Sequence, residues 1–108
     1  VFVAVRAVAL GREVVAVLGQ YAPTGIEPTD LLTALGEVPG VTEVHDLHVW
    51  TLTSGMDVAT AHLVTSRPDT GPEVLEAASL MLRERFHVAH ATLQVETTDR
   101  STCQGADW

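Results

Sequence analysis

Cysteine is nearly absent from this sequence, because Cys103 is the single thiol among 108 residues. One thiol cannot form an internal disulfide, and without a CxxC pair the chain lacks a thiolate zinc knuckle. A chain that needs no disulfide suits a reducing compartment, so we expect a cytosolic location. Cys103 lies in a polar stretch, residues 98–108, which we expect to be a flexible tail.

Basic residues are also scarce. Six Lys and Arg residues stand against 14 Asp and Glu residues, and the formal net charge is -8. So acidic a domain repels phosphate backbones and anionic lipid surfaces, which argues against nucleic acid and against electrostatic membrane binding. The same long-range field attracts cations. A cation is therefore a better candidate ligand than an anion.

Long apolar runs are missing as well. The opening VFVAVRAVAL is followed by Arg12 and Glu13, whereas a membrane span needs about 20 mainly apolar residues. It also lacks the small-residue cleavage site of a signal peptide. The chain begins at Val1 without a methionine, so we expect a fragment. Residues 1–20 are then either the end of a transmembrane helix or an amphipathic helix.

Catalytic signatures are absent too. The sequence contains no nucleophile elbow and no glycine-rich phosphate loop. His45 and Asp46 could mimic a catalytic dyad, but adjacent residues of a strand face opposite sides. We therefore expect that the chain is not an enzyme.

What is present is the pattern of one small globular domain. Hydrophobic residues make up 46% and charged residues 19% of the chain, as in ordinary folded proteins. Two prolines and a glycine make residues 21–28 a linker. Residues 29–97 form the compact domain. Its periodicity predicts helices over 29–38 and 73–86 and strands over 41–52, 56–65 and 89–97.

This order of elements predicts an α+β fold. A turn at 53–55 joins the first two strands into a hairpin, and a helical crossover makes the second and third strands parallel. The expected architecture is a ferredoxin-like sandwich (α-β-β-α-β), with a three-stranded mixed sheet, two helices on one face and a preceding N-terminal helix.

Strand alternation sorts polar side chains onto the face that the helices leave open. That face gathers six residues: His48, Trp50, His62, His90, Gln94 and Glu96. His45 falls formally on the covered side, but it lies near the start of its strand, where a bulge can re-aim it. His87 lies at a helix end, where we expect it to act as a cap.

This polar face has two interpretations. Imidazole and carboxylate groups suit zinc, which takes four ligands, so the cluster predicts a metal site. The alternative is a solvated sheet face with hydrogen-bonded histidines. Trp50 is likewise either core under a loop or the anchor of a protein interface. The sequence pattern alone does not decide between the two interpretations of the polar face, or between the two interpretations of Trp50.

Three segments together resemble the C-terminal domain of the cation diffusion facilitator family. They are PGVTEVHDLHVWTLTSG at 39–55, AHLVT at 61–65 and FHVAHATLQVE at 86–96. The earlier YAPTGIEPTDL is similar to the family's linker, so the resemblance covers residues 21–97. Residues 1–20 are similar to the cytosolic end of the family's last transmembrane helix, and Arg6 and Arg12 suit that side of a membrane.

The resemblance implies a regulatory domain of a zinc/proton antiporter that exports metal from the cytosol. It implies a homodimer at the cytosolic face of the cell membrane, joined to the transmembrane domain of the same polypeptide. The implied metal ligands are His45, His62, His90 and Glu96, with His48, Asp46 and Gln94 as second choices. Zinc is the implied ion, and cobalt, nickel, cadmium or iron could compete.

Two other functions fit the same residues. The domain could be a structural dimerisation module whose histidines bind no metal, and chelator-insensitive dimerisation would favour that. It could also be a small-ligand regulatory domain, which would need a pocket. A metal site, by contrast, should weaken in acid because ligating imidazoles must be neutral.

Overall fold

The computed structural model describes residues 1–97. Its elements are α1 (Phe2–Leu18), α2 (Pro28–Gly36), β1 (Val41–Thr53), β2 (Met56–Thr65), a 3-10 turn η1 (Pro68–Thr70), α3 (Gly71–Phe86) and β3 (His90–Thr97). The expected α-β-β-α-β order after an N-terminal helix is confirmed. The expectations for the 98–108 tail and for Cys103 lie outside the described residues.

The three strands form one mixed sheet in the order β1-β2-β3. β1 and β2 are antiparallel, and β2 and β3 are parallel. The hairpin turn places Gly55 at φ +77, a conformation in which a glycine avoids the strain of a side chain. The crossover through α3 then returns the chain to the far side of β2, as the sequence predicts.

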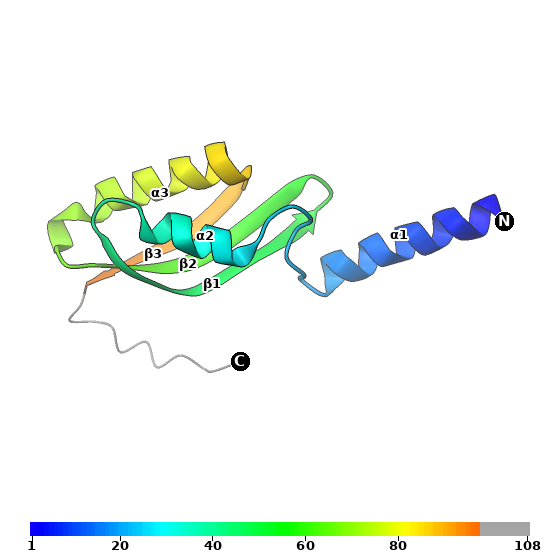
Figure 1. The fold of residues 1–108 in the computed structure, drawn as a ribbon, viewed down its shortest axis with the longest axis horizontal. Helices are drawn as coiled ribbons and strands as arrows, with labels where there is room; N and C mark the ends of the chain where they lie inside the picture. Colours follow the sequence, from blue (N-terminus) through cyan, green and yellow to red (C-terminus); the bar gives the residue numbers. More distant parts are fainter. Residues whose placement is uncertain (98–108) are drawn as a thin grey trace.

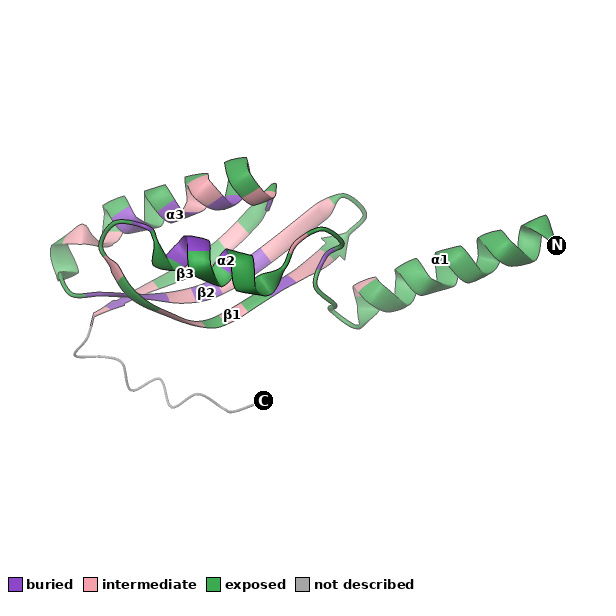
Figure 2. Ribbon diagram, viewed as in Figure 1, coloured by how far each residue is buried: buried purple, intermediate pink, exposed green. Residues whose placement is uncertain are grey.

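Two helices, α2 and α3, cover one face of the sheet (Figure 1). Their buried residues recur at helical spacing and meet the inward-facing residues of β2. The main members of this core are Leu31, Leu35, Ala59, Ala61, Leu63, Val74, Ala78 and Leu82. Figure 2 shows the buried positions on the sides of α2 and α3 that face the sheet. Each fully buried leucine contributes roughly 1.5–3 kcal/mol, so this layer holds the sheet and leaves its other face open.

The helix boundaries follow local chemistry. Pro28 occupies the first turn of α2, where the missing N–H costs nothing. α3 begins at Gly71, slightly earlier than expected, because η1 leads directly into it. His87 ends α3 as its C-cap in the left-handed conformation at φ 56, and a backbone N–H at the cap donates to the carbonyl oxygen of Leu82.

The N-terminal helix α1 stands apart from the core. It projects beyond the hairpin end of the sheet (Figures 1 and 2), and within the described chain none of its residues is buried. Phe2 and Val3 are 78% and 79% exposed despite being apolar. At 1.5 Å per residue its 17 residues span about 26 Å. Among residues 1–97, the structure contains no helix with the length and apolar character that crossing a membrane requires.

Candidate metal centre

A bulge in β1 places His45 on the open face of the sheet. His45 pairs with His62 and His48 pairs with Thr60, so three steps along β1 match two along β2. Asp46 absorbs the extra residue at φ 52, a left-handed conformation that aspartate tolerates better than most residues. The extra residue shifts the in-and-out alternation of side chains along β1 by one position. His45 and His48 therefore both lie on the open face of the sheet, with His62 and Thr60. The expectation that a bulge could re-aim His45 is confirmed.

Sheet register then brings ligands from three strands together. In one cross-strand row, His45 of β1 lies opposite His62 of β2, which lies opposite Gln94 of β3. Glu96 lies two residues further along β3, on the same face as Gln94 because strand side chains alternate. Residues that are distant in sequence thus become neighbours.

Glu96 is the centre of this cluster. Only 5% of the residue is exposed, which is rare for a carboxylate unless it is paired or bound to a cation. Its Oε2 lies 3.2 Å from His45 Nε2, and its Oε1 lies 2.9 Å from His62 Nδ1. The two imidazole rings meet edge to face with their centroids 4.9 Å apart. One ligand atom from each of the three residues lies within 4.8 Å of the others.

These residues fit a small divalent cation. His62 Nδ1 is buried and makes no acceptable hydrogen bond among the described residues, although Glu96 Oε1 is 2.9 Å away. A ring nitrogen and a carboxylate oxygen at this separation are close enough to bind one ion together. Zinc bonds of about 2.0–2.1 Å in a tetrahedron put ligand atoms about 3.3 Å apart. The two separations between Glu96 and the histidines, 3.2 and 2.9 Å, are close to that value.

Polar side chains surround the three central residues. Asp46 Oδ2 lies 3.7 Å from His62 Nε2, the ring nitrogen that faces away from Glu96. The other oxygen of Asp46 contacts His48 Nε2 at 2.9 Å, and this hydrogen bond lowers the pKa of the Asp46 carboxyl. The side-chain N–H of Gln94 donates to Glu96 Oε1 at 2.8 Å. The three second-choice residues thus lie around the cluster.

The structure places His90 away from this group. His90 pairs with Val58 at the start of β3, whereas Gln94 pairs with His62. Four residues of strand separate these rows by about 13 Å. His90 is exposed and shares the open face, but it is not brought together with His45, His62 and Glu96.

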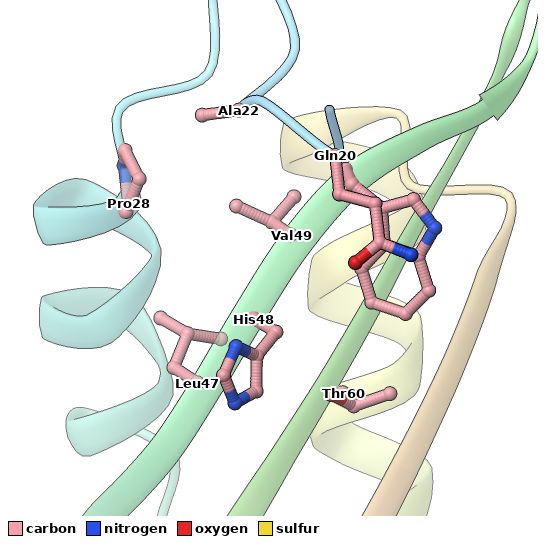
Figure 3. A pocket seen from close by; sticks show the side chains of 8 residues that line it. Gln20, Ala22, Pro28, Leu47, His48, Val49 and Thr60 are labelled. Atoms are coloured by element: carbon pink, nitrogen blue, oxygen red, sulfur yellow. The ribbon is translucent and has the colours of Figure 1, made fainter. Parts of the chain in front are cut away.

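A shallow cavity of about 530 Å³ lies between β1 and the connection from α1 to α2. Figure 3 shows Leu47 and His48 of β1 in it, with Ala22 and Pro28 at its edge. Trp50 is half-buried and lines the same cavity. No local sequence pattern marks this cavity, because its walls come from separate segments.

Comparison with known proteins agrees with this arrangement. Residues 23–98 match the family model described as the cytoplasmic domain of cation efflux proteins. The chain belongs to the cation efflux family. The cation efflux match includes every strand and every residue of the metal cluster.

Several transporters are similar to this cation efflux domain. The vacuolar zinc transporter TgZnT of Toxoplasma gondii is 33% identical over 96% of this chain and 12% of its own length. Human proton-coupled zinc antiporter SLC30A2 is 34% identical over 86% of this chain and 26% of its own. Human calcium/manganese antiporter SLC30A10 is 37% identical over 82% of this chain and 18% of its own. The chain therefore spans about a quarter or less of these curated relatives.

A solved structure shares the fold. The metal-bound C-terminal domain of the CzcD transporter from Cuprividus metallidurans is 36% identical, with a TM-score of 0.59. The match covers 66% of this chain and 99% of the CzcD domain. At the level of the family, these relatives are transporters rather than enzymes, in agreement with the sequence analysis.

Proposed function

We propose that this chain is the cytosolic, metal-binding regulatory domain of a divalent cation/proton antiporter that exports metal from the cytosol. The observation that carries the proposal is the convergence of His45, His62 and the buried Glu96 from three strands. Zinc is the favoured ion because two imidazoles and a carboxylate suit it. The zinc transporters among the relatives support the same choice.

The ion would be held by His45 Nε2, His62 Nδ1 and the Glu96 carboxylate. The ion would supply positive charge beside the buried Glu96 side chain and would link β1, β2 and β3. Asp46 would orient His62 through the opposite ring nitrogen, as carboxylates beside metal-bound histidines commonly do.

Regulation would act through a dimer. Two domains of net charge -8 repel each other, and a bound cation reduces that repulsion. If the ion binds the closed dimer more tightly than the open one, it shifts the population toward the closed form. Residues 21–28 would act as the linker, and residues 1–20 as the cytosolic end of the last transmembrane helix. The domain would then transmit metal occupancy to the membrane part of the same polypeptide.

Calorimetric titration of the chain with zinc at neutral pH tests the proposal. We expect saturable binding that His62→Ala abolishes, because that variant removes a central ligand. His90→Ala is the matched control, since it removes a histidine from the same sheet face about 13 Å away. Absence of saturable heat in the wild-type chain would refute the proposal, and loss of binding in His90→Ala would refute the assignment of ligands.

One observation favours a second candidate, a structural dimerisation module without a metal. His45 Nε2 and Glu96 Oε2 are 3.2 Å apart and form a hydrogen bond, so the two side chains can pair without an ion. Sedimentation with and without chelator separates the two functions. A dimer affinity that increases with zinc supports regulation. A dimer affinity that neither zinc nor chelator changes supports the structural module.

A further inference from the structure

Thr65 and Glu96 are the two buried polar residues of the described chain, and they contact each other. Thr65 is fully buried, and Glu96 is 5% exposed. Thr65 is the last residue of β2 and pairs with Thr97, the neighbour of Glu96 in β3. The Thr65 hydroxyl donates to the backbone carbonyl oxygen of Glu96 at 3.4 Å. A buried hydroxyl costs free energy unless it is hydrogen-bonded, so the folded chain favours an arrangement that keeps this contact.

The same hydroxyl also contacts the connection that follows β2. Thr65 Oγ1 lies 3.1 Å from the carbonyl oxygen of Arg67. That carbonyl oxygen also accepts from the Thr70 hydroxyl at 2.8 Å and from the Thr70 backbone N–H at 3.3 Å. A hydroxyl has one hydrogen to donate, so Thr65 shares it between Arg67 and Glu96. Because Arg67 keeps both donors from Thr70 when Thr65 loses its hydroxyl, the connection should survive that loss.

The place of Glu96 in its strand makes an anchor for its backbone valuable. Glu96 is the last residue but one of β3, which ends at Thr97, and the ends of elements open more readily than their middles. From this place its carboxylate contacts His45 at 3.2 Å and His62 at 2.9 Å. Ligands of a metal site have to be held within about 0.5 Å of their working geometry. A bond that ties the backbone of Glu96 to the end of β2 therefore helps to hold its carboxylate beside the two histidines.

We propose that Thr65 is a positioning residue of the metal site, whose buried hydroxyl fixes the backbone of Glu96 so that the carboxylate meets His45 and His62. This inference rests on the proposed metal-binding function. Thr65 acts on the backbone of Glu96 and so on both carboxylate oxygens alike. Its loss should therefore weaken ion binding without removing any ligand atom.

Zinc titrations of Thr65→Val in the full chain test the inference. Valine has the same branched shape as threonine and favours strands, so the variant should fold. Without the hydroxyl we expect the zinc affinity to fall about tenfold, at the low end of the range for residues that orient metal ligands. The visible absorption of cobalt(II) bound in place of zinc should change as well, because it reports how the ligands are arranged around the ion.

Two further variants separate positioning from stability. Thr65→Ser keeps the hydroxyl but loses a buried methyl group, so it should unfold at a lower urea concentration than wild type. It should nevertheless bind zinc within about twofold of the wild-type affinity, because the bond to Glu96 remains. Thr70→Val is the matched control, since it removes another hydroxyl donor to the Arg67 carbonyl and leaves the bond between Thr65 and Glu96 in place. It should leave the zinc affinity and the cobalt spectrum unchanged.

The outcomes distinguish this inference from the proposed function. If the wild-type chain binds no zinc, the proposed function fails and this inference fails with it. If the wild-type chain binds zinc and Thr65→Val stays within about twofold of it, this inference alone fails. Equal losses of zinc affinity in Thr65→Val and Thr70→Val would also overturn it, because the connection after β2 would then be the cause. A loss in Thr65→Ser as large as that in Thr65→Val would overturn it too, since the hydroxyl would then not matter.

Discussion

At the scale of single residues, Asp46 links backbone geometry to the chemistry of the site. Its left-handed backbone at φ 52 forms the bulge that turns His45 toward Glu96. Its carboxylate contacts His48 and lies near the outer nitrogen of His62. One residue therefore shapes the backbone beside His45 and places a carboxylate next to His48 and His62.

The substitution Asp46→Asn separates these two roles. Asparagine also tolerates the left-handed conformation, so the bulge should persist and the metal-free protein should stay folded. The loss of the carboxylate should weaken zinc binding about tenfold or more, because His62 loses its partner charge. Calorimetry measures the affinity, and circular dichroism checks the fold. Asp30→Asn in α2 is the control, and equal zinc affinities for the two variants would contradict the role of Asp46.

At the scale of elements, α3 supports the sheet without touching the metal cluster. Val74, Ala78 and Leu82 recur on one side of the helix, and each is at most 1% exposed. They pack on the covered face, whereas His45, His62 and Glu96 use the open one. Stability and metal binding are therefore expected to respond to different substitutions.

Leu82→Ala tests this separation. Removing a buried leucine leaves a cavity and should lower the free energy of unfolding by about 2–5 kcal/mol, as measured by urea denaturation. Leu80→Ala on the same helix is the control, because Leu80 is 49% exposed and its loss should change stability by less than about 0.5 kcal/mol. Similar effects of the two variants would contradict the packing.

The connection between β2 and α3 has its own pH dependence. Arg67 binds both oxygens of Asp69, at 2.6 and 3.2 Å. The hydrogen bond from Arg67 lowers the pKa of Asp69 below its ordinary value of 3.8. A lowered carboxyl pKa stabilises the fold above that ordinary value, and the stabilisation is lost as pH falls through the lowered pKa.

Asp69→Asn should therefore lower the melting temperature slightly at pH 7. The difference from wild type should vanish in strong acid, where Asp69 is protonated in both the folded and the unfolded chain. The effect should be small and should shrink with salt, because both side chains are exposed. Scanning calorimetry across a pH series measures it, and a difference that grows toward low pH would contradict the assignment.

At the scale of the whole molecule, the two faces of the sheet differ in what they contribute. The helices bury one face as a core, and the other face presents His45, His62 and Glu96 in a chain of net charge -8. The exposed apolar helix α1 extends from the hairpin end (Figure 1). In the proposed transporter, this arrangement leaves the metal face free while α1 connects to the membrane part.

Zinc should stabilise the whole domain. Free zinc at 100 times its dissociation constant adds about 2.7 kcal/mol to the free energy of unfolding if only the folded chain binds it. Chelator should reverse the gain, and His62→Ala should prevent it. The gain should also decrease as pH falls from about 7.5 to about 5.5, because protons compete for the ligating imidazoles. Thermal melts measure each effect, and a melting temperature insensitive to zinc at pH 7.5 would contradict the prediction.

The sequence by itself determined the order of elements and the two faces of each strand. Turn residues and periodicities of two and 3.6 are local properties, so the α+β fold and the open polar face follow from them. His62, Gln94 and Glu96 were placed on one face by this reasoning alone. The resemblance to the cation efflux family added the assignment of His45.

Only the tertiary structure decided which histidines meet. Alternation assigns a residue to a face but says nothing of its row, and the register of β3 against β2 depends on how α3 packs across the sheet. That register sets Gln94, not His90, opposite His62. The bulge at Asp46 likewise depends on pairing with β2. Register and bulges arise from contacts between distant segments, which a period along one strand does not encode.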